Sequence, residues 1–301
     1  MLSLYYHPLY TYGIDKKSRF PRNRYKLIFK KLRESKADLK FHTPEFIEKK
    51  DIALAHDSRY IKSFLSGKLS IEEKRRIGLQ PWNNNIVDRT MLILGGSIGA
   101  LSRAIENNGI AANMAGGTHH AHYSFGSGYC IFNDLAICAR KAIKDYDNIN
   151  KIMIIDLDVH QGDGTAAILS KDKDIFTLSV HCESNFPMHK MKSSLDINLK
   201  KQIDDREYLS MLSKTLDEIS TIDSDILFFQ AGVDTLYSDK LGHLSLTRDG
   251  LKIRNKMVLD YAKSKAIPVV IFMGGGYSDP IDDTVDAFVD LFEQCSDYVI
   301  S

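Results

Sequence analysis

The chain has 301 residues, of which 44% are hydrophobic, and its 40 Lys and Arg residues against 39 Asp and Glu leave a formal net charge of +1. This composition is that of a globular chain with a large core, and the balanced charge argues against direct nucleic-acid binding or a membrane-surface protein. Because there is no secretory signal pattern, no bilayer-spanning apolar stretch and no CxxC spacing among the four cysteines, we expect a cytoplasmic protein with reduced thiols.

The predicted elements alternate between helices and short apolar strands. Residues 87–105 place apolar side chains four and three positions apart, which is typical of one continuous helix. After it we predict, in chain order, a strand at 110–114, a helix at 133–146 with Asn133 as N-cap, strands at 152–155 and 175–180, a helix at 205–222, a strand at 226–229, a helix at 247–263, a strand at 269–272, and a last helix with Asp279 as N-cap and Pro280 as its first residue.

This alternation indicates parallel strands joined by crossover helices. The sequence therefore predicts an α/β fold, a parallel sheet flanked by helices on both faces. We find no internal repeat, low-complexity tract or linker, so we expect residues 1–301 to form a single domain. Nothing in the sequence indicates an oligomeric state.

Polar side chains follow four of the predicted strands at their carboxyl ends, which is where open parallel sheets form their sites. The groups in question are the histidines at 119, 120 and 122, the segment 156–163, Asp234 and Tyr277. A single Asp or His after a strand is more often a helix cap or a solvated loop residue, but four such coincidences favour a common site. Of these groups, we expect His122 to lie at the surface or behind the reacting side chains.

Three of these groups suit a metal ion. Asp158 and His160 alternate along an extended segment and therefore share a face, and Asp234 can add a third ligand from a neighbouring strand. Carboxylate and imidazole ligands suit zinc, and ferrous iron is an alternative at such a mixed site. Three protein ligands leave one position open for water or substrate, which is the catalytic arrangement.

Proton-transfer groups accompany the predicted metal site. His119 and His120 offer two imidazoles, and Asp156 and Asp163 can fix their tautomers by accepting hydrogen bonds. Tyr277 lies in a glycine-rich segment and can donate to a developing oxyanion, although a lone tyrosine is more often a packed aromatic side chain.

Five segments together resemble the zinc-dependent histone deacetylase family. They are GGTHHAH (116–122), GSGYCIFND (126–134), IDLDVHQGDGT (155–165), QAGVDTL (230–236) and MGGGYS (273–278). Their order and approximate spacing also match, so the resemblance extends from His7 to about Phe292. The upstream segments His7-Pro8, Phe20-Pro21 with Arg24-Tyr25, and 56–60 are most similar to class IV, the short single-domain branch.

The resemblance implies an arginase–deacetylase fold and a hydrolase that removes an acetyl or longer fatty acyl group from the ε-amine of lysine. Acylated polyamines or other small amides are the alternative substrates. It also implies roles for eight residues: zinc ligands Asp158, His160 and Asp234, general base and then acid His120 with Asp163 behind it, electrostatic partner His119 paired with Asp156, and carbonyl-polarising Tyr277.

The resemblance further implies a substrate tunnel and a second ion site. The tunnel positions are Gly128, Tyr129 and Phe186, with Leu241 at the rim. Tyr129 stands where many relatives have Phe, which adds a hydroxyl to the tunnel wall. The second site would hold a structural potassium ion on the main-chain carbonyls of Asp156, Asp158 and His160, together with Ser179 and Val180.

Three other functions compete with this interpretation. Gly95 to Gly99 matches the G-x-S-x-G nucleophile elbow of serine hydrolases, with Ser97 as the nucleophile. That elbow needs a strand before it. Here the helical pattern continues through residues 95–99 and leaves Ser97 off the apolar stripe. A two-metal amidinohydrolase would need paired aspartates where 233–236 has only Asp234. A non-catalytic acyl-lysine reader with the same groups remains a third possibility.

Overall fold

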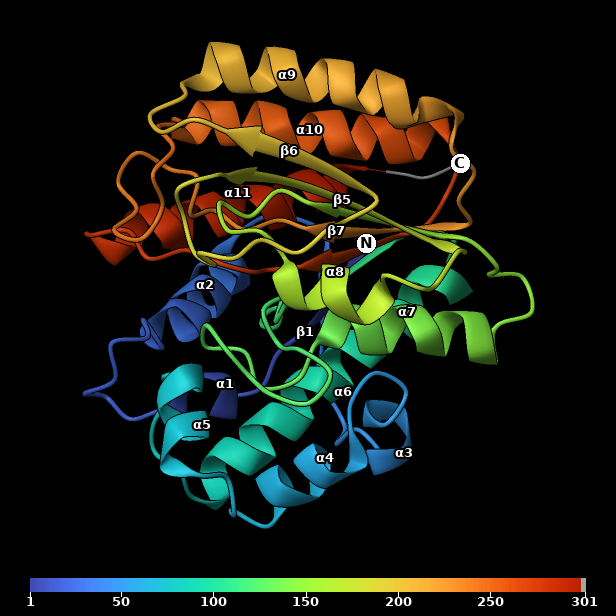
Figure 1. The fold of residues 1–301 in the computed structure, drawn as a ribbon. Helices are drawn as coiled ribbons and strands as arrows, with labels where there is room; N and C mark the ends of the chain where they lie inside the picture. Colours follow the sequence, from blue (N-terminus) through green and yellow to red (C-terminus); the bar gives the residue numbers. More distant parts are fainter. Residues whose placement is uncertain (299–301) are drawn as a thin grey trace.

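Eight parallel strands form one sheet in the computed structural model, which describes residues 1–298 (Figure 1). The strand order across the sheet is β2-β1-β3-β8-β7-β4-β5-β6, and every neighbouring pair is parallel. The strands are β1 (Leu2–Tyr5), β2 (Leu39–His42), β3 (Ile110–Asn113), β4 (Ile152–Asp156), β5 (Ile175–Cys182), β6 (Leu195–Leu199), β7 (Ile226–Gln230) and β8 (Val269–Phe272).

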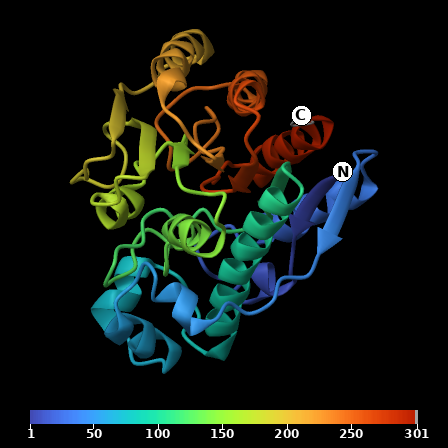
Figure 2. The same ribbon diagram turned by 90° about the vertical axis from the view of Figure 1, so that its right-hand side faces the viewer.

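Helices cover both faces of this sheet, as Figure 1 shows. They are α1 (Leu9–Tyr12), α2 (Asn23–Glu34), α3 (Lys49–Ile52), α4 (Ser58–Leu65), α5 (Ile71–Ile77), α6 (Asn84–Glu106), α7 (Asp134–Asp145), α8 (Asp163–Leu169), α9 (Asp205–Glu218) with the 3-10 turn η1 (Ile219–Thr221), α10 (Arg248–Ser264) and α11 (Ile281–Asp297). Helix α10 packs between α9 and α11, while α6 contacts β1, β3 and β8 and lies beside α7. Figure 2 shows α6 as a long helix running past β1.

The predicted fold class is confirmed. Strands β4, β7 and β8 consist entirely of buried residues, because helices on both sides of a parallel sheet leave no solvated face. The strands at 110–113 and 175–182 are also present, and Asn133 caps α7 by accepting a hydrogen bond from the main chain of Ala136. The helix predicted at 205–222 ends earlier, at Glu218, and continues as the 3-10 turn.

The predicted start of the last helix is wrong by one residue. Asp279 is not its N-cap: Pro280 occupies that position in an extended conformation (φ −68°, ψ 154°), and the helix begins at Ile281. The Asp279 side chain instead forms an ion pair with Lys240. The structure also contains elements before residue 84 that the sequence pattern did not predict, among them β1 and β2.

Helix α6 is continuous through the segment that matches the serine-hydrolase motif. Its glycines allow neighbouring segments of the chain to approach closely: a Cβ on Gly95 would lie 1.7 Å from the carbonyl oxygen of Glu45. Ser97 lies off the apolar stripe but is nevertheless fully buried, and it donates a hydrogen bond to Asp134 (2.8 Å). A buried serine inside a helix has no elbow geometry, so the structure gives no support to Ser97 as a nucleophile.

Two further sequence expectations concern the cysteines and the absence of a bilayer-spanning segment. All four cysteines are buried and free. Within residues 1–298, no helix combines the length and the apolar character needed to cross a bilayer.

Candidate active site

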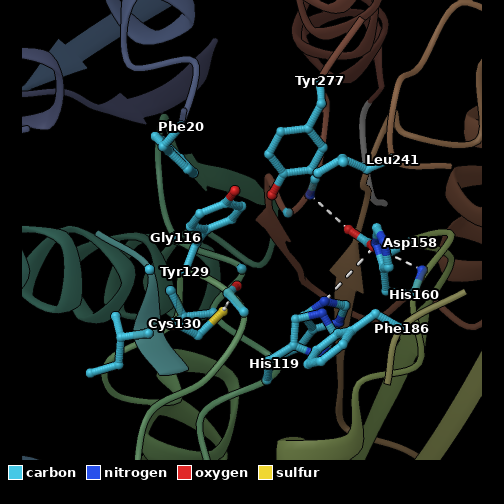
Figure 3. A pocket seen from close by; sticks show the side chains of 18 of the residues that line it. Phe20, Gly116, His119, Tyr129, Cys130, Asp158, His160, Phe186, Leu241 and Tyr277 are labelled. Carbon is cyan, nitrogen blue, oxygen red and sulfur yellow. Dashed lines mark hydrogen bonds and ion pairs between the residues drawn. The ribbon is translucent and has the colours of Figure 1, made fainter. Parts of the chain in front are cut away.

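The groups that follow four predicted strands meet at one edge of the sheet. Strands β3, β8, β7 and β4 are consecutive neighbours, and all point the same way, so their carboxyl ends lie side by side. A cavity of about 460 Å³ opens there and is lined by residues that directly follow β3, β4 and β8 and by Leu241 and His243 from the loop after β7. Figure 3 shows His119, Asp158, His160 and Tyr277 converging on this cavity.

Asp158, His160 and Asp234 bring three ligand atoms together. All three residues are buried, and one donor atom of each lies within 4.8 Å of the others. The Nδ1 atom of His160 is 3.1 Å from Asp158 Oδ1 and 3.1 Å from Asp234 Oδ2. Two ligands of a tetrahedral zinc ion are separated by roughly 3.3–3.6 Å, given bonds of about 2.0–2.2 Å. The cluster therefore has the donor set and nearly the spacing that a divalent ion needs.

The charges of this cluster also fit a cation. Burial, and then the neighbouring charge of Asp158, raise the pKa of Asp234 above its usual range. Burial disfavours a charged His160, but hydrogen bonds to the two carboxylates outweigh it and raise the pKa of His160 to about 10. Both shifts have one electrostatic meaning: the point between the ligand atoms attracts positive charge.

The loop after β8 leaves room for these carboxylates only because it has a glycine at position 275. A Cβ on Gly275 would lie 1.8 Å from Asp234 Oδ2, and the main-chain N–H of Gly275 donates to Asp158 Oδ2 (2.7 Å). The main chain of Val159 similarly donates to Asp234 Oδ1 (2.9 Å). Each carboxylate thus has one oxygen held by a neighbouring loop and the other facing His160 Nδ1, and in Asp158 this second oxygen also accepts from the main chain of His160 (3.0 Å).

The two adjacent histidines each contact a separate carboxylate. His119 Nδ1 is 2.8 Å from Asp156 Oδ2, and His120 Nδ1 is 2.6 Å from Asp163 Oδ1. Both rings are buried, and their centroids are 4.1 Å apart. The paired contacts are those expected of groups that fix imidazole tautomers, with Nδ1 donating to the carboxylate.

The surroundings push the two histidines toward different protonation states. For His119, burial opposes the charged form, but the charges of Asp156 and Asp158 outweigh it and raise the pKa to about 9. For His120, burial and then the charge of His119 lower the pKa to about 4 despite the contact with Asp163. A charged and a neutral imidazole therefore stand side by side, which is an arrangement suited to acid–base chemistry.

Asp163 has a second imidazole on its other oxygen. His122 Nε2 lies 2.9 Å from Asp163 Oδ2, and 16% of the His122 side chain is exposed. Of the two positions expected for His122, the structure shows the one behind the reacting groups.

Tyr277 points its ring into the cavity from the loop after β8 (Figure 3). Burial raises the pKa of the Tyr277 hydroxyl well above its usual value, so the phenol stays protonated. Asp239 holds this loop by accepting hydrogen bonds from the main chain of Tyr277 (2.6 Å) and of Leu241 (2.8 Å). Tyr277 is thereby fixed beside the cluster of Asp158, His160 and Asp234.

The predicted tunnel residues line the same cavity. Gly128 and Tyr129 adopt positive φ angles of 52° and 66°. The Phe186 ring packs edge-on against His120 with the ring centroids 4.9 Å apart, and the side chains of Phe186 and Leu241 are partly exposed at 41% and 42%. An aromatic wall with an exposed rim suits an elongated apolar group that enters from solvent.

The segments expected to hold potassium are also neighbours. Asp156 is paired with Ser179 in the register of β4 and β5, and Val180 is the next residue of β5. Asp158 and His160 follow β4 directly. The Ser179 hydroxyl lies 3.0 Å from His181 Nδ1.

Other residues of the site had no role in the sequence analysis. Arg24 is fully buried and donates to the carbonyls of Gly274 (2.9 Å) and Gly276 (3.0 Å), which places its charge beneath the loop of Tyr277. Asp239 fixes the same loop from the other side. Arg24 entered the sequence analysis only as part of the upstream segments that resemble class IV, with no role assigned, and Asp239 has no sequence signal of its own, because an aspartate in a loop is ordinary until the fold brings it to a site.

The chain is similar to several known proteins. A family model described as histone deacetylase domain matches residues 18–291. An uncharacterised protein of Picosynechococcus sp. is 41% identical over 283 residues, which cover 93% of each chain. Histone deacetylase 2 of Arabidopsis thaliana is 31% identical over 238 residues, covering 75% of this chain and 60% of that protein.

Two further similarities concern a bacterial protein and a solved structure. The acetoin utilization protein AcuC of Bacillus subtilis is 28% identical over 300 residues, covering 90% of this chain and 76% of AcuC. The crystal structure of the HDA15 HD domain superposes with a TM-score of 0.83 over 98% of this chain and 91% of that one, at 17% identity. The structural match shows a shared arginase–deacetylase fold.

Proposed function

This chain belongs to the histone deacetylase family, and on that premise we propose that it is a metal-dependent hydrolase that removes acyl groups from the ε-amine of lysine. The observation that carries the proposal is the meeting of Asp158, His160 and Asp234 beside two histidines that each contact a carboxylate. The relatives named above support a deacetylase-type hydrolase, and the finer assignments rest on this chain's own residues.

We assign the metal to Asp158, His160 and Asp234. When bound, zinc would polarise the acyl carbonyl and lower the pKa of a coordinated water toward about 7. Ferrous iron would suit the same two carboxylates and imidazole. The three ligands follow β4 and β7, and two of them, Asp158 and His160, also line the cavity, so a substrate in the cavity would reach the bound ion.

The proton transfers fall to His120. Its Nδ1–H donates to Asp163, which leaves Nε2 as the basic atom that takes a proton from the attacking water. The same nitrogen then delivers a proton to the leaving amine. His119, held by Asp156 and packed beside His120, supports negative charge that develops next to it.

Tyr277 and the tunnel orient the substrate. The Tyr277 hydroxyl donates to the carbonyl oxygen as it becomes an oxyanion. Gly128, Tyr129 and Phe186 would enclose the apolar four-carbon stem of the lysine, whose charge is masked by acylation. Leu241 contributes to the rim.

We further propose that residues 1–301 act as one catalytic domain of the class IV type in the cytoplasm, where free cysteines are stable. A structural potassium ion would bind the carbonyls of Asp156, Asp158 and His160 with Ser179 and Val180. An acylated polyamine or another small acylated amine is the alternative substrate, because the residues assigned to the reaction contact the acyl amide and not the rest of the substrate.

The test is a panel of lysine peptides carrying acetyl to myristoyl groups, together with an acetylated polyamine, ranked by kcat/KM with and without a zinc chelator. We expect at least one acyl-lysine peptide to be hydrolysed best, with activity lost in chelator and restored by zinc. If the metal-loaded protein binds acyl-lysine peptides without hydrolysing any, it is a reader. If a serine-directed phosphonate abolishes activity and the chelator does not, the metal mechanism is wrong.

A further inference from the structure

We propose that His122 is a positioning residue for His120 and acts by holding the second oxygen of Asp163. The inference builds on the proposed function, since His120 is the base assigned there. In the sequence His122 belongs to the same segment as His119 and His120, but the mechanism above gives it no task.

Asp163 joins two imidazoles, one through each of its oxygens. Oδ1 lies 2.6 Å from His120 Nδ1, and Oδ2 lies 2.9 Å from His122 Nε2. Because the two contacts lie on opposite oxygens of one carboxylate, the plane of that carboxylate cannot turn without breaking both. The His122 contact therefore constrains the direction in which Oδ1 faces His120.

His122 is itself fixed by three separate contacts. Its ring stacks on Phe125 with centroids 4.5 Å apart and planes at 15°, and Arg76 lies over the Phe125 ring at 4.7 Å. The main-chain N–H of His122 donates to the carbonyl of Phe125 (2.9 Å), and its own carbonyl accepts from His56 Nδ1 (3.0 Å). A histidine placed only for solubility would have no such support.

Loss of His122 would leave one oxygen of Asp163 without a donor. Among residues 1–298, the hydrogen bonds to Asp163 Oδ2 come from His122 alone. The carboxylate, whose residue is only 5% exposed, would then turn toward water or another group, and the His120 ring would lose its fixed orientation. A loosened base slows the chemical steps more than it weakens substrate binding, because the tunnel residues are unchanged.

The experiment compares His122→Phe with His122→Gln in the metal-loaded protein, using the best acyl-lysine peptide. Phenylalanine keeps the stack on Phe125 and removes the donor, whereas the glutamine side-chain amide can still donate to Asp163 Oδ2. We expect kcat of His122→Phe to fall about 10-fold or more with KM within about twofold. The glutamine variant should recover to within about threefold of the unaltered protein.

His42, in the outermost strand β2, provides a matched control. His42 in β2 also stacks on an aromatic ring, that of Tyr5 (5.0 Å, 21°), and its Nε2 lies 3.2 Å from the Ser3 hydroxyl. His42→Phe should leave kcat and KM unchanged. Unaltered kcat in His122→Phe, or equal losses in His122→Phe and His122→Gln, would overturn the proposal, and so would an effect on KM alone.

A spectroscopic readout separates this proposal from the proposed function. The proton of a short imidazole–carboxylate hydrogen bond resonates far downfield in the NMR spectrum, and we expect that signal from His120 Nδ1–H in the unaltered protein and in His122→Gln. It should shift or broaden in His122→Phe. If the unaltered protein hydrolyses no substrate, the proposed function fails. A signal identical in all three proteins refutes the positioning role independently.

Discussion

At the level of single residues, the site depends on buried charges that have specific partners. Asp156 contacts His119, and Asp163 contacts the adjacent His120. Asp158 lies 3.8 Å from His119 as well, so the two histidines have unequal electrostatic environments. Equal side chains in one segment thus acquire different protonation states, because burial and neighbouring charge act on each separately.

The hydroxyl of Tyr277 is the residue-scale feature that is simplest to remove. Tyr277→Phe should lower kcat by about 10²–10³-fold, the usual cost of removing an oxyanion donor. The melting temperature and bound metal should stay unchanged, because the ring keeps its packing near Phe20 and Tyr129. Steady-state kinetics and thermal melts check this, and near-normal turnover would count against the assigned role.

Replacement of Asp158 tests the assigned metal ligands. Asp158→Ala removes one of three donor atoms and should abolish both stoichiometric metal binding and acyl-lysine hydrolysis. Metal content per chain after dialysis, measured by mass spectrometry, gives the answer without reference to any substrate. Retention of one equivalent of zinc in the variant would contradict the assignment.

These residues could be predicted from the sequence because they share a position relative to the strands. Asp158, His160 and Asp234 follow runs of buried apolar residues, and parallel strands bring such ends together. Asp239 and Arg24 could not be predicted, since they act by holding the loop of Tyr277, and contacts over 38 and 252 positions leave no local pattern.

At the level of elements, α6 shows how packing decides between two interpretations of one motif. Its apolar positions recur every three or four residues, and its glycines face other segments of the same chain rather than a substrate. The periodicity was sufficient to predict the helix. The burial of Ser97 was not predictable, because it depends on Asp134 at the start of α7.

Gly95 provides a test of that packing. Replacing a helix glycine by alanine ordinarily stabilises a protein by about 0.5–1 kcal/mol. Gly95→Ala should instead destabilise by about 1–3 kcal/mol, because its Cβ would lie 1.7 Å from the Glu45 carbonyl oxygen. Denaturant unfolding measures the sign directly, and a stabilised variant would show that α6 does not pack as described.

His56 links the loop before α4 to the start of α7 and should make stability depend on pH. Its Nδ1 donates to the carbonyl of His122, and its Nε2 accepts from the main chain of Asn133 (2.8 Å). Burial lowers the pKa of His56 to about 4 from 6.5. Between these values the unfolded chain binds a proton that the folded chain does not, so stability falls as the pH drops from 6.5 toward 4.

The expected loss across that range is at most about 3 kcal/mol, from about 1.4 kcal/mol per pKa unit. His56→Gln removes this titration, so its free energy of unfolding should fall less over the same range. Urea unfolding at a series of pH values compares the two proteins. Parallel pH dependences would show that His56 is not the group responsible.

The short elements at the edges of the sheet were not predicted, for a physical reason. Strands β2 and β6 are edge strands covered on fewer sides, and they mix polar with apolar side chains, whereas β1 lies inside the sheet but has only four residues, one of them Ser3. Only strands buried on both faces produce the continuous apolar runs that identify a strand from sequence alone.

At the level of the whole molecule, chain topology assembles the site. The order β3-β8-β7-β4 makes neighbours of strands whose paired residues lie up to 159 positions apart in the chain, as Ile110 and Val269 do. The alternation of strands and helices predicts that functional groups share one edge of the sheet. It does not predict the order of the strands, which sets which groups meet.

The most direct test of the central claim is the titration of metal-stripped protein with zinc while hydrolysis of an acyl-lysine peptide is followed. The account predicts that activity rises in proportion to added zinc and reaches its plateau at one equivalent per chain. Full activity before any zinc is added, or a plateau that needs two equivalents, would contradict it.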